Sequence, residues 1–520
     1  MEKWKPLLME TWRDVLDLNA SIFETDIAYV DVESAHRYTY KDFHERSNRF
    51  VNALNDMGVK RGDRVAILSM DRPQYLEAFS VCKAGMIYVP INFRLSKDDV
   101  SFLLNDSGAK ILVTEKDFLD VVGSIRSQIP AVEKIISFDC DTDDSPAYEE
   151  LIGKYPQDDP PEAPSGDDIL GIVYTTGTTA RPKGVIRKHR ETMHFERMLV
   201  KGFRWKHSDR IICGSPMFHV GLLHGYGAGL YAGATFFIPR RVDPGHLLEV
   251  IEKEEITCLV GIPTTINLMI HHPDIQTRNH GSLRRFAYLG APMPRKVAEE
   301  AVRLIGPVFF QVYGLTEACG TTMCFHEDVD EDRAYSSCGK AIRGTELKIV
   351  GENDEELPVG QVGEILFRSD AMSGGYWDNP DLTEETYRDG WLHTGDMGKV
   401  DEDGFLYIID RKKDMIITGG ENVSPTEVEE TLYRHPAVLE ASVIGIPDDK
   451  WGEAVKAVIV LKKGMSVSGE EIILYCKEEI AGFKCPKTVD FVTELPKSPV
   501  GKILRREIRE RYWSGEGRNV

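Results

Sequence analysis

The spacing of hydrophobic and polar residues predicts alternating helices and strands along most of the chain. Phe43, Phe50, Leu54 and Met57 fall on one face at helical spacing, and Gly58 follows where a helix would end. Strands that alternate with helices pair in parallel, so the pattern predicts an α/β fold with helices on the faces of its sheets. The expected strands include Arg64–Leu68, Met86–Pro90, Lys110–Thr114, Cys258–Pro263, Phe286–Gly290 and Pro307–Tyr313, and the expected helices include Pro73–Lys83, Asp98–Asn105, His246–Glu255 and Pro294–Ile305.

The pattern changes twice in the second half of the chain. Beyond Gly344, the segments Leu347–Val350, Gly363–Arg368 and Phe405–Ile409 have the pattern of strands in a smaller β-rich unit. From about Lys413 short strands and helices begin again, which predicts a compact C-terminal domain of roughly 110 residues. The pattern therefore divides the chain into a large N-terminal part and a small C-terminal part.

Composition and charge narrow the range of partners. The chain has 520 residues, of which 42% are hydrophobic and 28% charged, and this excludes disorder, collagen and coiled coil as the main architecture. With 63 basic and 84 acidic side chains, its formal net charge is -21. Such a surface repels phosphate backbones, so no nucleic-acid partner is expected. A small anionic ligand would need a local cluster of cationic side chains and backbone N–H groups.

The cysteines and the apolar segments favour a cytoplasmic protein without a membrane span. The nine cysteines are scattered, without a Cys-x-x-Cys pair, and suggest free thiols in a reducing compartment. The charged segment Met1–Leu8 does not resemble a signal peptide. The uncharged run Val220–Pro239 contains His224 and five glycines, and we expect a buried helix followed by the strand Ala234–Ile238.

The segment with the clearest chemical pattern is Tyr174–Val185, which reads Tyr-Thr-Thr-Gly-Thr-Thr-Ala-Arg-Pro-Lys-Gly-Val. Glycine permits close approach of the backbone, the four threonine hydroxyls can donate to phosphate oxygens, and Lys183 adds a positive charge. The segment is not a Walker A loop, and Pro182 disfavours immediate entry into a helix, so we expect a loop between two strands. Taken alone, it is either a cradle for a polyphosphate or a flexible polar hairpin.

Together with this loop, further motifs in order along nearly the whole chain resemble the adenylate-forming superfamily, which includes acyl- and aryl-CoA synthetases, peptide-synthetase adenylation domains and firefly luciferase. Ala180 departs from the pattern, because the family usually has glycine there. The resembling motifs are Ser215–His219, Gly290–Pro292, Tyr313–Glu317, Gly363–Glu364, Trp391–Asp396, Asp410–Arg411 and Pro499–Ile503.

The resemblance implies an AMP-forming acyl-CoA synthetase, an acid–thiol ligase of the kind used in fatty acid metabolism. A carboxylic acid attacks the α-phosphate of ATP, which gives acyl-AMP and pyrophosphate, and the thiol of coenzyme A then displaces AMP. Two anions meet in the first step, so Mg²⁺ and a cationic side chain are expected to neutralise charge. The implied fold is a large N-terminal adenylation domain at residues 1–411, with α/β subdomains and a small β-rich subdomain, and a small mobile α+β C-terminal domain at residues 412–520.

Residue by residue, the resemblance implies positions for the nucleotide and the catalytic groups. Glu317 matches the Mg²⁺ ligand of the family, and its carboxylate oxygens suit that metal. Asp396 matches the residue that binds the two ribose hydroxyls, Tyr313 the aromatic face for adenine, and Lys502 the lysine that bridges carboxylate and phosphate. The implied catalytic residues are Lys502, Thr316, Glu317 and His219, and the implied ATP- or AMP-binding residues are Thr175, Thr176, Gly177, Thr178, Thr179, Lys183, Gly290, Ala291, Pro292, Tyr313, Gly314, Thr316, Asp396, Arg411 and Lys502.

The acyl group is implied to lie beside His219, at the aromatic position that gates the acyl pocket in this family. Amino-acid-activating adenylation domains have an aspartate at the matching place, so a histidine favours a plain carboxylic acid. The implied pocket residues are mostly small and include no lysine or arginine, which favours a medium-length, branched, cyclic or aromatic monocarboxylate. They are His219, Gly221, Gly225, Val312, Gly320 and Thr321.

The second half-reaction is implied to use another face of the C-terminal domain, after that domain turns about a hinge at Lys413. The loop Thr418–Asn422 would line the pantetheine tunnel, where glycine leaves room for a thin chain. The basic and aromatic segment Phe483–Lys487 would hold the 3′-phospho-ADP part of coenzyme A. The implied CoA-binding residues are Gly419, Gly420, Glu421, Lys484 and Lys487.

Three alternatives stay open on the sequence. The chain could load a carrier protein in place of coenzyme A. It could be a luciferase-type oxygenase, although its Gly-Arg-Asn-Val ending is not a peroxisomal Ser-Lys-Leu address. It could also bind nucleotides without catalysis, which the presence of Lys502, Glu317 and Asp396 argues against. Whether the chain forms a homodimer also stays open.

Overall fold

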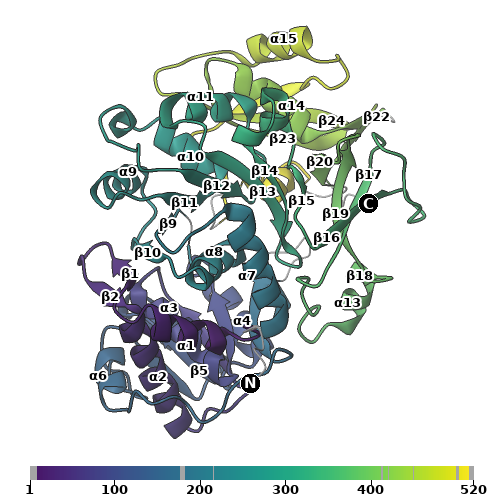
Figure 1. The fold of residues 1–520 in the computed structure, drawn as a ribbon. Coiled ribbons are helices and arrows are strands. Elements are labelled where there is room, and N and C mark those ends of the chain that lie inside the picture. Colours follow the sequence, from purple (N-terminus) through teal and green to yellow (C-terminus); the bar gives the residue numbers. More distant parts are fainter. Residues whose placement is uncertain are drawn as a thin grey trace, which may run out of the picture.

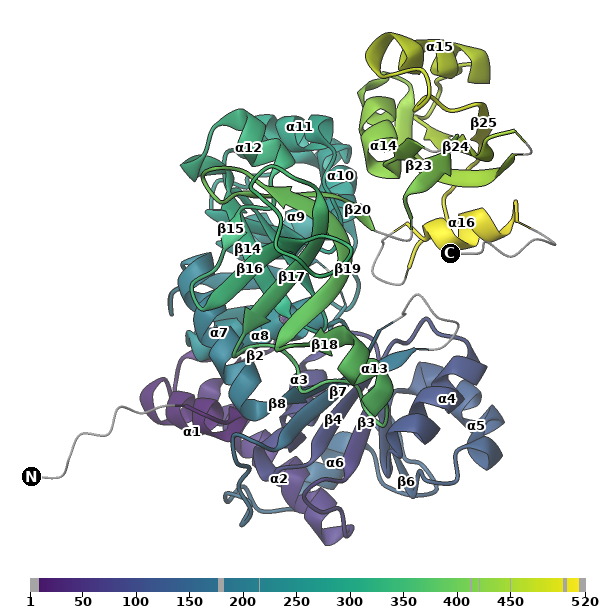
Figure 2. The same ribbon diagram turned by 90° about the vertical axis from the view of Figure 1, so that its right-hand side faces the viewer.

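The chain forms four β-sheets with helices packed around them in the computed structural model, which describes residues 9–175, 182–214, 216–411, 414–419, 421–448, 450–498 and 503–513. Three sheets of six, nine and five strands build the large N-terminal part (Figure 1). A second five-stranded sheet builds the C-terminal part, which Figure 2 shows as a separate lobe above the six-stranded sheet.

The six-stranded sheet is parallel except at its edge, where the last strand, β8, runs antiparallel to β7. Its order is β6-β5-β3-β4-β7-β8. Alternate residues of β3 face opposite layers, because Val65 and Ile67 belong to one hydrophobic core while Ala66 and Leu68 belong to another. The strands are β3 (Arg64–Leu68), β4 (Ile87–Ile91), β5 (Ile111–Thr114), β6 (Lys134–Ser137), β7 (Ile169–Thr175) and β8 (Lys183–Lys188).

The nine-stranded sheet has a parallel centre and antiparallel edges. Its order is β15-β14-β13-β12-β11-β9-β10-β1-β2, so an N-terminal hairpin extends a sheet that is otherwise built from residues beyond 209. The strands are β1 (Ile27–Asp31), β2 (Arg37–Thr39), β9 (Arg210–Cys213), β10 (Thr235–Ile238), β11 (Cys258–Gly261), β12 (Arg285–Leu289), β13 (Phe309–Leu315), β14 (Cys319–Phe325) and β15 (Lys340–Ala341).

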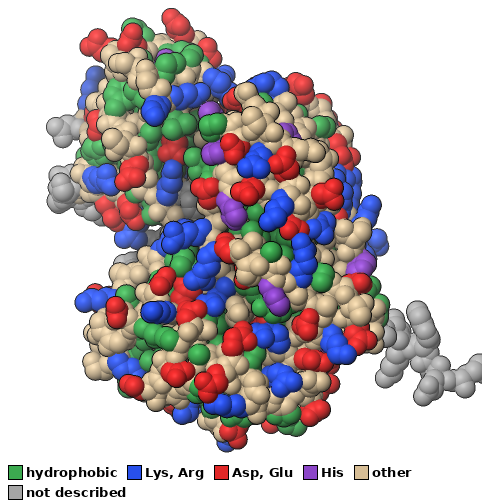
Figure 3. All heavy atoms as spheres, turned by 90° about the vertical axis from the view of Figure 1, so that its left-hand side faces the viewer, with side chains coloured by type: hydrophobic (Ala, Val, Ile, Leu, Met, Phe, Trp, Pro, Cys, Tyr) green, Lys and Arg blue, Asp and Glu red, His purple; other side chains and the backbone are tan. Residues whose placement is uncertain are grey.

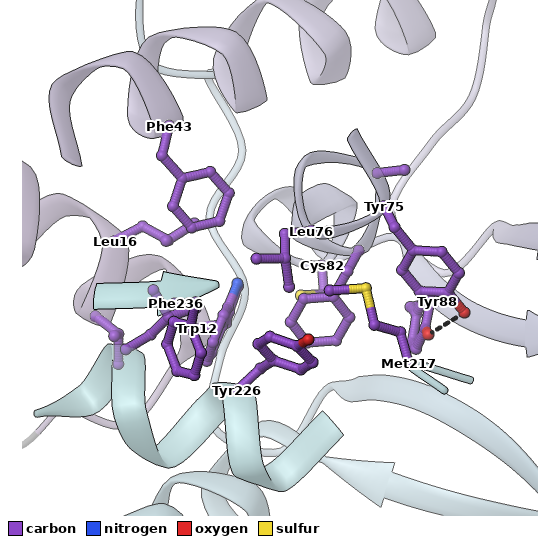
Figure 4. Close-up of a cluster of buried hydrophobic side chains, with 14 of the residues drawn as sticks. Trp12, Leu16, Phe43, Tyr75, Leu76, Cys82, Tyr88, Met217, Tyr226 and Phe236 are labelled. Carbon is purple, nitrogen blue, oxygen red and sulfur yellow. Dashed lines mark hydrogen bonds between the residues drawn. The ribbon is translucent and has the colours of Figure 1, made fainter. Parts of the chain in front are cut away.

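A shared helical layer separates these two sheets, and further helices cover their outer faces. Figure 4 shows Trp12, Phe43 and Tyr226 gathered in the core of the shared layer. The shared layer contains α1 (Trp12–Ile22), α2 (Tyr40–Asp56), α3 (Pro73–Phe79), α6 (Tyr148–Gly153), α7 (His189–Phe203) and α8 (Val220–Tyr231). Outside lie α4 (Lys97–Ser107) and α5 (Leu119–Ser124) on the six-stranded sheet, and α9 (Pro244–Lys253), α10 (Pro263–Ile270) and α11 (Arg295–Ile305) on the nine-stranded sheet.

Two smaller sheets complete the fold. The antiparallel sheet after α12 (Glu331–Ser336) contains β16 (Thr345–Val350), β17 (Gly363–Ser369), β18 (Tyr387–Arg388), β19 (Trp391–Val400) and β20 (Leu406–Arg411), with α13 (Pro380–Thr386) inserted before β18. The C-terminal sheet contains β21 (Ile416–Thr418), β22 (Glu421–Val423), β23 (Val438–Asp448), β24 (Gly452–Leu461) and β25 (Thr488–Phe491), and its helices are α14 (Pro425–Arg434), α15 (Gly469–Glu479) and α16 (Arg505–Glu510).

This architecture confirms the expected α/β class, the small β-rich unit and the C-terminal α+β unit. One expected helix is shorter, because α3 ends at Phe79 and a 3₁₀ turn continues over Ser80–Ala84 to Gly85, which has a φ of 77°. No described helix is long and apolar enough to cross a membrane. Acidic and basic side chains are intermixed over the face in Figure 3, so the net negative charge does not gather in one patch there.

Candidate functional site

Two of the sequence motifs lie side by side at the edge of the nine-stranded sheet that is formed by the carboxyl ends of its parallel strands. Strands β12 and β13 are parallel neighbours, with Leu289 opposite Val312. The segment Gly290–Pro292 therefore leaves the sheet next to Tyr313. Gly290 has a φ of 87°, a left-handed conformation that glycine adopts without strain and that lets the chain turn at this edge.

A buried carboxylate joins three of the implied nucleotide-binding residues. The Tyr313 hydroxyl donates to Asp396 Oδ2 at 2.6 Å, and Arg411 Nε lies 2.7 Å from Asp396 Oδ1. Asp396 on β19 and Arg411 at the end of β20 are opposite each other in the antiparallel register. Burial, followed by the negative charge of Asp396, raises the pKa of the Tyr313 phenol, so this group remains a protonated donor.

Glu317 lies in the turn between β13 and β14, and two groups from a distant segment hold it. The Tyr376 hydroxyl donates to Glu317 Oε1 at 2.6 Å, and the Ser373 N–H donates to the Glu317 carbonyl at 2.8 Å. Burial and the Glu317 carboxylate raise the pKa of Tyr376. Thr316 belongs to the same turn. The carboxylate oxygens of Glu317 are of the ligand type that Mg²⁺ prefers, so the residue fits the implied metal.

Tyr376 is a functional candidate that the sequence reasoning missed. The signal was present as the segment Gly374-Gly375-Tyr376-Trp377, whose glycines permit close approach to a neighbouring chain. Val185 of β8 forms an isolated bridge with Tyr376, and Lys183 Nζ lies 5.8 Å from the centre of the Tyr376 ring. The tyrosine therefore contacts both the strand after the glycine- and threonine-rich loop and the carboxylate of Glu317.

The expected loop between two strands is confirmed, because β7 and β8 form an antiparallel pair with Thr175 opposite Lys183. Both residues are partly buried at the start of the loop. The remaining loop positions predicted to bind phosphate, Thr176, Gly177, Thr178 and Thr179, lie outside the described residues.

Buried contacts anchor the segment that precedes His219. The Met217 N–H donates to Asp71 Oδ1 at 2.8 Å, and the Phe218 ring packs edge-on against Phe93 with centroids 5.5 Å apart. Figure 4 shows the Met217 side chain in the core beside Tyr88. The His219 N–H donates to Pro216, and α8 begins at the next residue. Burial raises the pKa of Asp71 to about 7. Nothing in the local sequence indicated this role for Asp71.

The residues predicted to line the acyl pocket come from α8, β13 and β14. Gly221 and Gly225 lie in α8, and a Cβ at Gly225 would lie 3.7 Å from the Cys213 sulfur, so the helix packs closely on the sheet. Val312 is buried on β13. Gly320 pairs with Gly314 across the β13–β14 hairpin, and the buried Thr321 donates to the Tyr313 carbonyl at 3.1 Å.

The predicted CoA-binding residues are only partly described. Gly419 has a φ of 60°, and its N–H donates to the Trp451 carbonyl at 2.8 Å, which places it beside an exposed indole. Glu421 is exposed next to it, and Lys487 is exposed elsewhere on this lobe. Lys484 Nζ is paired with Glu427 at 2.7 Å, so it would have to leave that partner to bind a phosphate. Gly420, Lys502 and Lys413, the predicted hinge, lie outside the described residues.

One cluster away from this edge has the composition of a metal site. Asp17, His44 and Asp159 offer ligand atoms within 4.8 Å of one another. The fully buried Lys83 lies among them, with Nζ 3.6 Å from Asp17 Oδ1. Burial lowers the pKa of Lys83 to about 8, so at neutral pH its ammonium is one cation of this cluster. Arg13 is another, with Nε 3.2 Å from Asp17 Oδ2 and Nη2 3.7 Å from Asp159 Oδ2.

The AMP-binding enzyme family matches residues 16–377, and the AMP-binding enzyme C-terminal domain matches residues 427–502. A fatty acid–[acyl-carrier-protein] ligase, ScoC of Streptomyces coeruleorubidus, is 35% identical over 490 residues, covering 93% of each chain. A feruloyl-CoA synthase of an Amycolatopsis species is 36% identical over 487 residues, covering 91% of this chain and 94% of the relative. The crystal structure of the anthranilate CoA ligase AuaEII in complex with anthranoyl-AMP is 28% identical, with a TM-score of 0.90 over 96% of this chain and 97% of that one. The chain therefore belongs to the AMP-binding enzymes, as an acid–thiol ligase of the AMP-forming acyl-CoA synthetase family.

Proposed function

We propose that the protein is an ATP-dependent ligase that activates a monocarboxylic acid as its acyl-AMP and transfers the acyl group to coenzyme A. The observation that carries the proposal is the buried Asp396 carboxylate, which contacts both Arg411 of the small sheet and Tyr313 of β13, the strand that leads into the turn with Glu317. These groups match the needs of a nucleotide that must be bound, oriented and neutralised.

Each group has a distinct task in the first half-reaction. Asp396 accepts hydrogen bonds from the ribose hydroxyls. Its two carboxylate oxygens then bond the ribose as well as Tyr313 or Arg411. Thr316 and the threonines of the phosphate loop donate to phosphate oxygens. Glu317 would hold Mg²⁺, which supplies charge neutralisation on the phosphates when bound. Lys502 brings a positive charge between the attacking carboxylate and the α-phosphate.

We also propose that residues 1–411 and 412–520 are the two moving parts, with the hinge at Lys413. In support, Arg411 is paired with Asp396 inside the large part, while Asp410 is hydrogen-bonded to Ser424 and Arg505 of the C-terminal part. Rotation about Lys413 would carry Lys502 away and bring Gly419 to Glu421 towards the acyl-AMP.

The acyl group we favour is medium-length, branched, cyclic or aromatic, because the pocket residues on α8 and β14 are small. The second candidate acceptor is a carrier protein. It is supported by the 35% identity to ScoC, a ligase for an acyl carrier protein, and by the pairing of Lys484 with Glu427.

Pyrophosphate release from ATP and Mg²⁺, measured across a panel of carboxylic acids with and without coenzyme A, tests the proposal. Turnover that requires one class of acid and coenzyme A is the expected result. Release that ignores coenzyme A but rises with a phosphopantetheinylated carrier protein would favour the second acceptor. ATP binding without turnover on any acid would contradict the proposed ligase activity.

A further inference from the structure

The segment Ser373–Trp377, called the bridging segment below, contacts two parts of the candidate site that belong to different sheets. Its residue Tyr376 forms an antiparallel bridge with Val185, so the segment continues the pairing of the six-stranded sheet beyond β8. The backbone hydrogen bonds between the two run from the Gly374 N–H to the Ile186 carbonyl at 3.1 Å, from the Ile186 N–H to the Gly375 carbonyl at 2.9 Å, and from the Trp377 N–H to the Gly184 carbonyl at 2.7 Å.

The bridging segment also holds the turn of the nine-stranded sheet that carries Glu317. The Tyr376 hydroxyl donates to Glu317 Oε1 at 2.6 Å, and the Ser373 N–H donates to the Glu317 carbonyl at 2.8 Å. The Ser373 hydroxyl lies 2.5 Å from the Tyr387 hydroxyl. The Tyr376 N–H donates to Thr383 Oγ1 of α13 at 2.9 Å. The carboxylate and the backbone of Glu317 are therefore both held by a segment that is bonded to β8.

Trp377 anchors the bridging segment to the six-stranded sheet. Its indole N–H donates to the Asp106 carbonyl at the end of α4 at 3.0 Å, and the Arg64 guanidinium carbon lies 5.7 Å from the centre of its ring. Asp106 Oδ2 in turn accepts from the hydroxyl of Tyr174, near the end of β7, at 2.6 Å. A Cβ added to Gly184 would lie 3.2 Å from the Trp377 Cβ. The segment therefore packs closely against both strands that flank the glycine- and threonine-rich loop.

Tyr376 lies between the cation proposed for the phosphates and the carboxylate proposed for Mg²⁺. Lys183 begins β8, and its Nζ lies 5.8 Å from the centre of the Tyr376 ring, while the hydroxyl of the same ring reaches Glu317. Lys183 and Glu317 belong to different sheets, yet both would act on one ligand. A shift of about 1 Å between groups that act together can cost ~100-fold in rate, so their spacing needs a fixed connection.

We infer that the bridging segment sets the spacing between Lys183 and Glu317, and that Trp377 is a positioning residue for ATP and Mg²⁺ together. The inference rests on the proposed function, in which Lys183 binds phosphate and Glu317 binds Mg²⁺. Trp377 acts on Lys183 through its backbone bond to the adjacent Gly184, and on Glu317 through the adjacent Tyr376. Loss of the indole therefore disturbs both groups, whereas loss of the Tyr376 hydroxyl disturbs Glu317 alone.

Calorimetric titration of ATP tests the inference through two quantities that do not require turnover. The Kd for ATP with excess chelator measures the contacts with phosphate, and the factor by which Mg²⁺ tightens ATP binding measures the metal ligand. We expect Trp377→Ala to raise this Kd about tenfold and to lower the Mg²⁺ factor about threefold, because residues that orient a ligating group typically change affinity by ~10- to 100-fold and Trp377 acts on Glu317 only through Tyr376. A wild-type value of either quantity in the folded variant would overturn the inference.

Two further tryptophan variants separate positioning from a loss of stability. Trp377→Phe keeps a ring but loses the N–H bonded to Asp106, so both quantities should fall between those of the wild type and of Trp377→Ala. It decides the question alone if the alanine variant does not fold. Trp513→Ala is the matched control, because the Trp513 indole N–H also donates to a backbone carbonyl, that of Gly445 at 2.9 Å, but in the C-terminal lobe. Equal shifts in the two alanine variants would overturn the inference.

Glu317→Gln distinguishes failure of the inference from failure of the proposed function. It should remove most of the Mg²⁺ factor, because an amide is a weaker ligand for Mg²⁺ than a carboxylate. A wild-type factor in this variant would contradict the proposed metal ligand, and the inference would fall with it. A factor that is lost in Glu317→Gln but unchanged in Trp377→Ala would overturn the inference alone.

Discussion

Two buried aspartates on neighbouring strands of one small sheet have opposite connections. Asp396 is held by Tyr313 and Arg411, so all its described side-chain partners belong to the large N-terminal part. Asp410 accepts from the Ser424 hydroxyl at 3.0 Å, the Thr426 N–H at 3.1 Å and Arg505 Nη1 at 3.0 Å, all from the C-terminal part. One aspartate completes a site, and the other joins two lobes.

The difference follows from strand geometry and from the kind of contact each aspartate makes. Neighbouring residues of a strand point to opposite faces, so Arg411 turns to Asp396 while Asp410 turns to the C-terminal lobe. The contacts at Asp410 are polar, and hydrogen bonds with water replace such contacts at a small net cost. The large part is held by shared hydrophobic cores. Opening them would expose apolar side chains to water, and water offers no equivalent interaction in return. Motion is therefore expected at the polar junction and not within the large part.

The largest effect is expected from the lysine that the C-terminal lobe would contribute. Lys502→Ala should lower the rate of acyl-AMP formation by about 10²- to 10³-fold, because a positive charge is lost where negative charge develops. The conversion of supplied acyl-AMP to thioester should remain. Pyrophosphate release and thioester formation, measured separately, check this, and normal adenylation by the variant would remove Lys502 from the mechanism.

The next largest effect is expected on the stability of the C-terminal lobe when Asp410 is substituted. Asp410→Ala leaves Arg505 without one of its carboxylates and removes three contacts across the junction, so the free energy of unfolding of the C-terminal lobe should fall by about 2 to 3 kcal/mol. Asp401→Ala is the matched control, because Asp401 bonds within the large part, to Phe405 and Arg333. Calorimetry in which both variants destabilise the same transition would argue against a separate junction.

Asp71, a third buried aspartate, predicts a pH dependence. Its pKa is about 7 against an ordinary 3.8, so the folded protein holds a proton that the unfolded chain releases between these values. The stabilising contribution is complete below the lower value and is lost as the pH rises through about 7, on the order of 4 kcal/mol in all and about 3 kcal/mol between pH 5 and pH 8. Chemical denaturation at pH 5 and pH 8 should show this fall in the wild type and a smaller one in Asp71→Asn. Parallel curves for the two proteins would contradict it.

Asp396→Asn tests by kinetics whether Asp396 belongs to the nucleotide site. The amide keeps one acceptor oxygen but loses the charge that pairs with Arg411, so the KM for ATP should rise about tenfold, while the KM for the acid stays close to its wild-type value. Steady-state rates with each substrate varied in turn measure both constants. A rise confined to the acid would place Asp396 in the acyl site instead.

The smallest effect is expected at Tyr376. Tyr376→Phe removes the hydroxyl that orients Glu317, so the Mg²⁺ concentration for half-maximal rate should rise about threefold. Tyr387→Phe is the control, because that hydroxyl is 3.4 Å from the Glu317 carbonyl and not at its carboxylate. Calorimetric titration of ATP with and without Mg²⁺ gives an independent reading, and equal shifts in both variants would mean a general loosening of the turn.

The local pattern of the chain determined most of the α/β alternation. Strand β3 was expected at the residues where it occurs, and β12 and α11 within one residue, because apolar periodicity is a local property. The helix α1 and the strands β1 and β2 were missed. Strand β1 pairs with β10, about 200 residues away in the chain, and no local pattern reports such a pairing.

The sequence alone determined the family, the ordered motifs and the residue types suited to nucleotide chemistry, because these are properties of the chain itself. Tertiary structure decided which strands share a sheet, that Tyr376 contacts Glu317, and that Asp71 holds the segment before His219. It also decided that Arg187 is buried and donates to the Ala371 carbonyl, 184 residues away in the chain. A side chain's partners and solvent exposure depend on elements far away in the chain, and only folding brings those elements together.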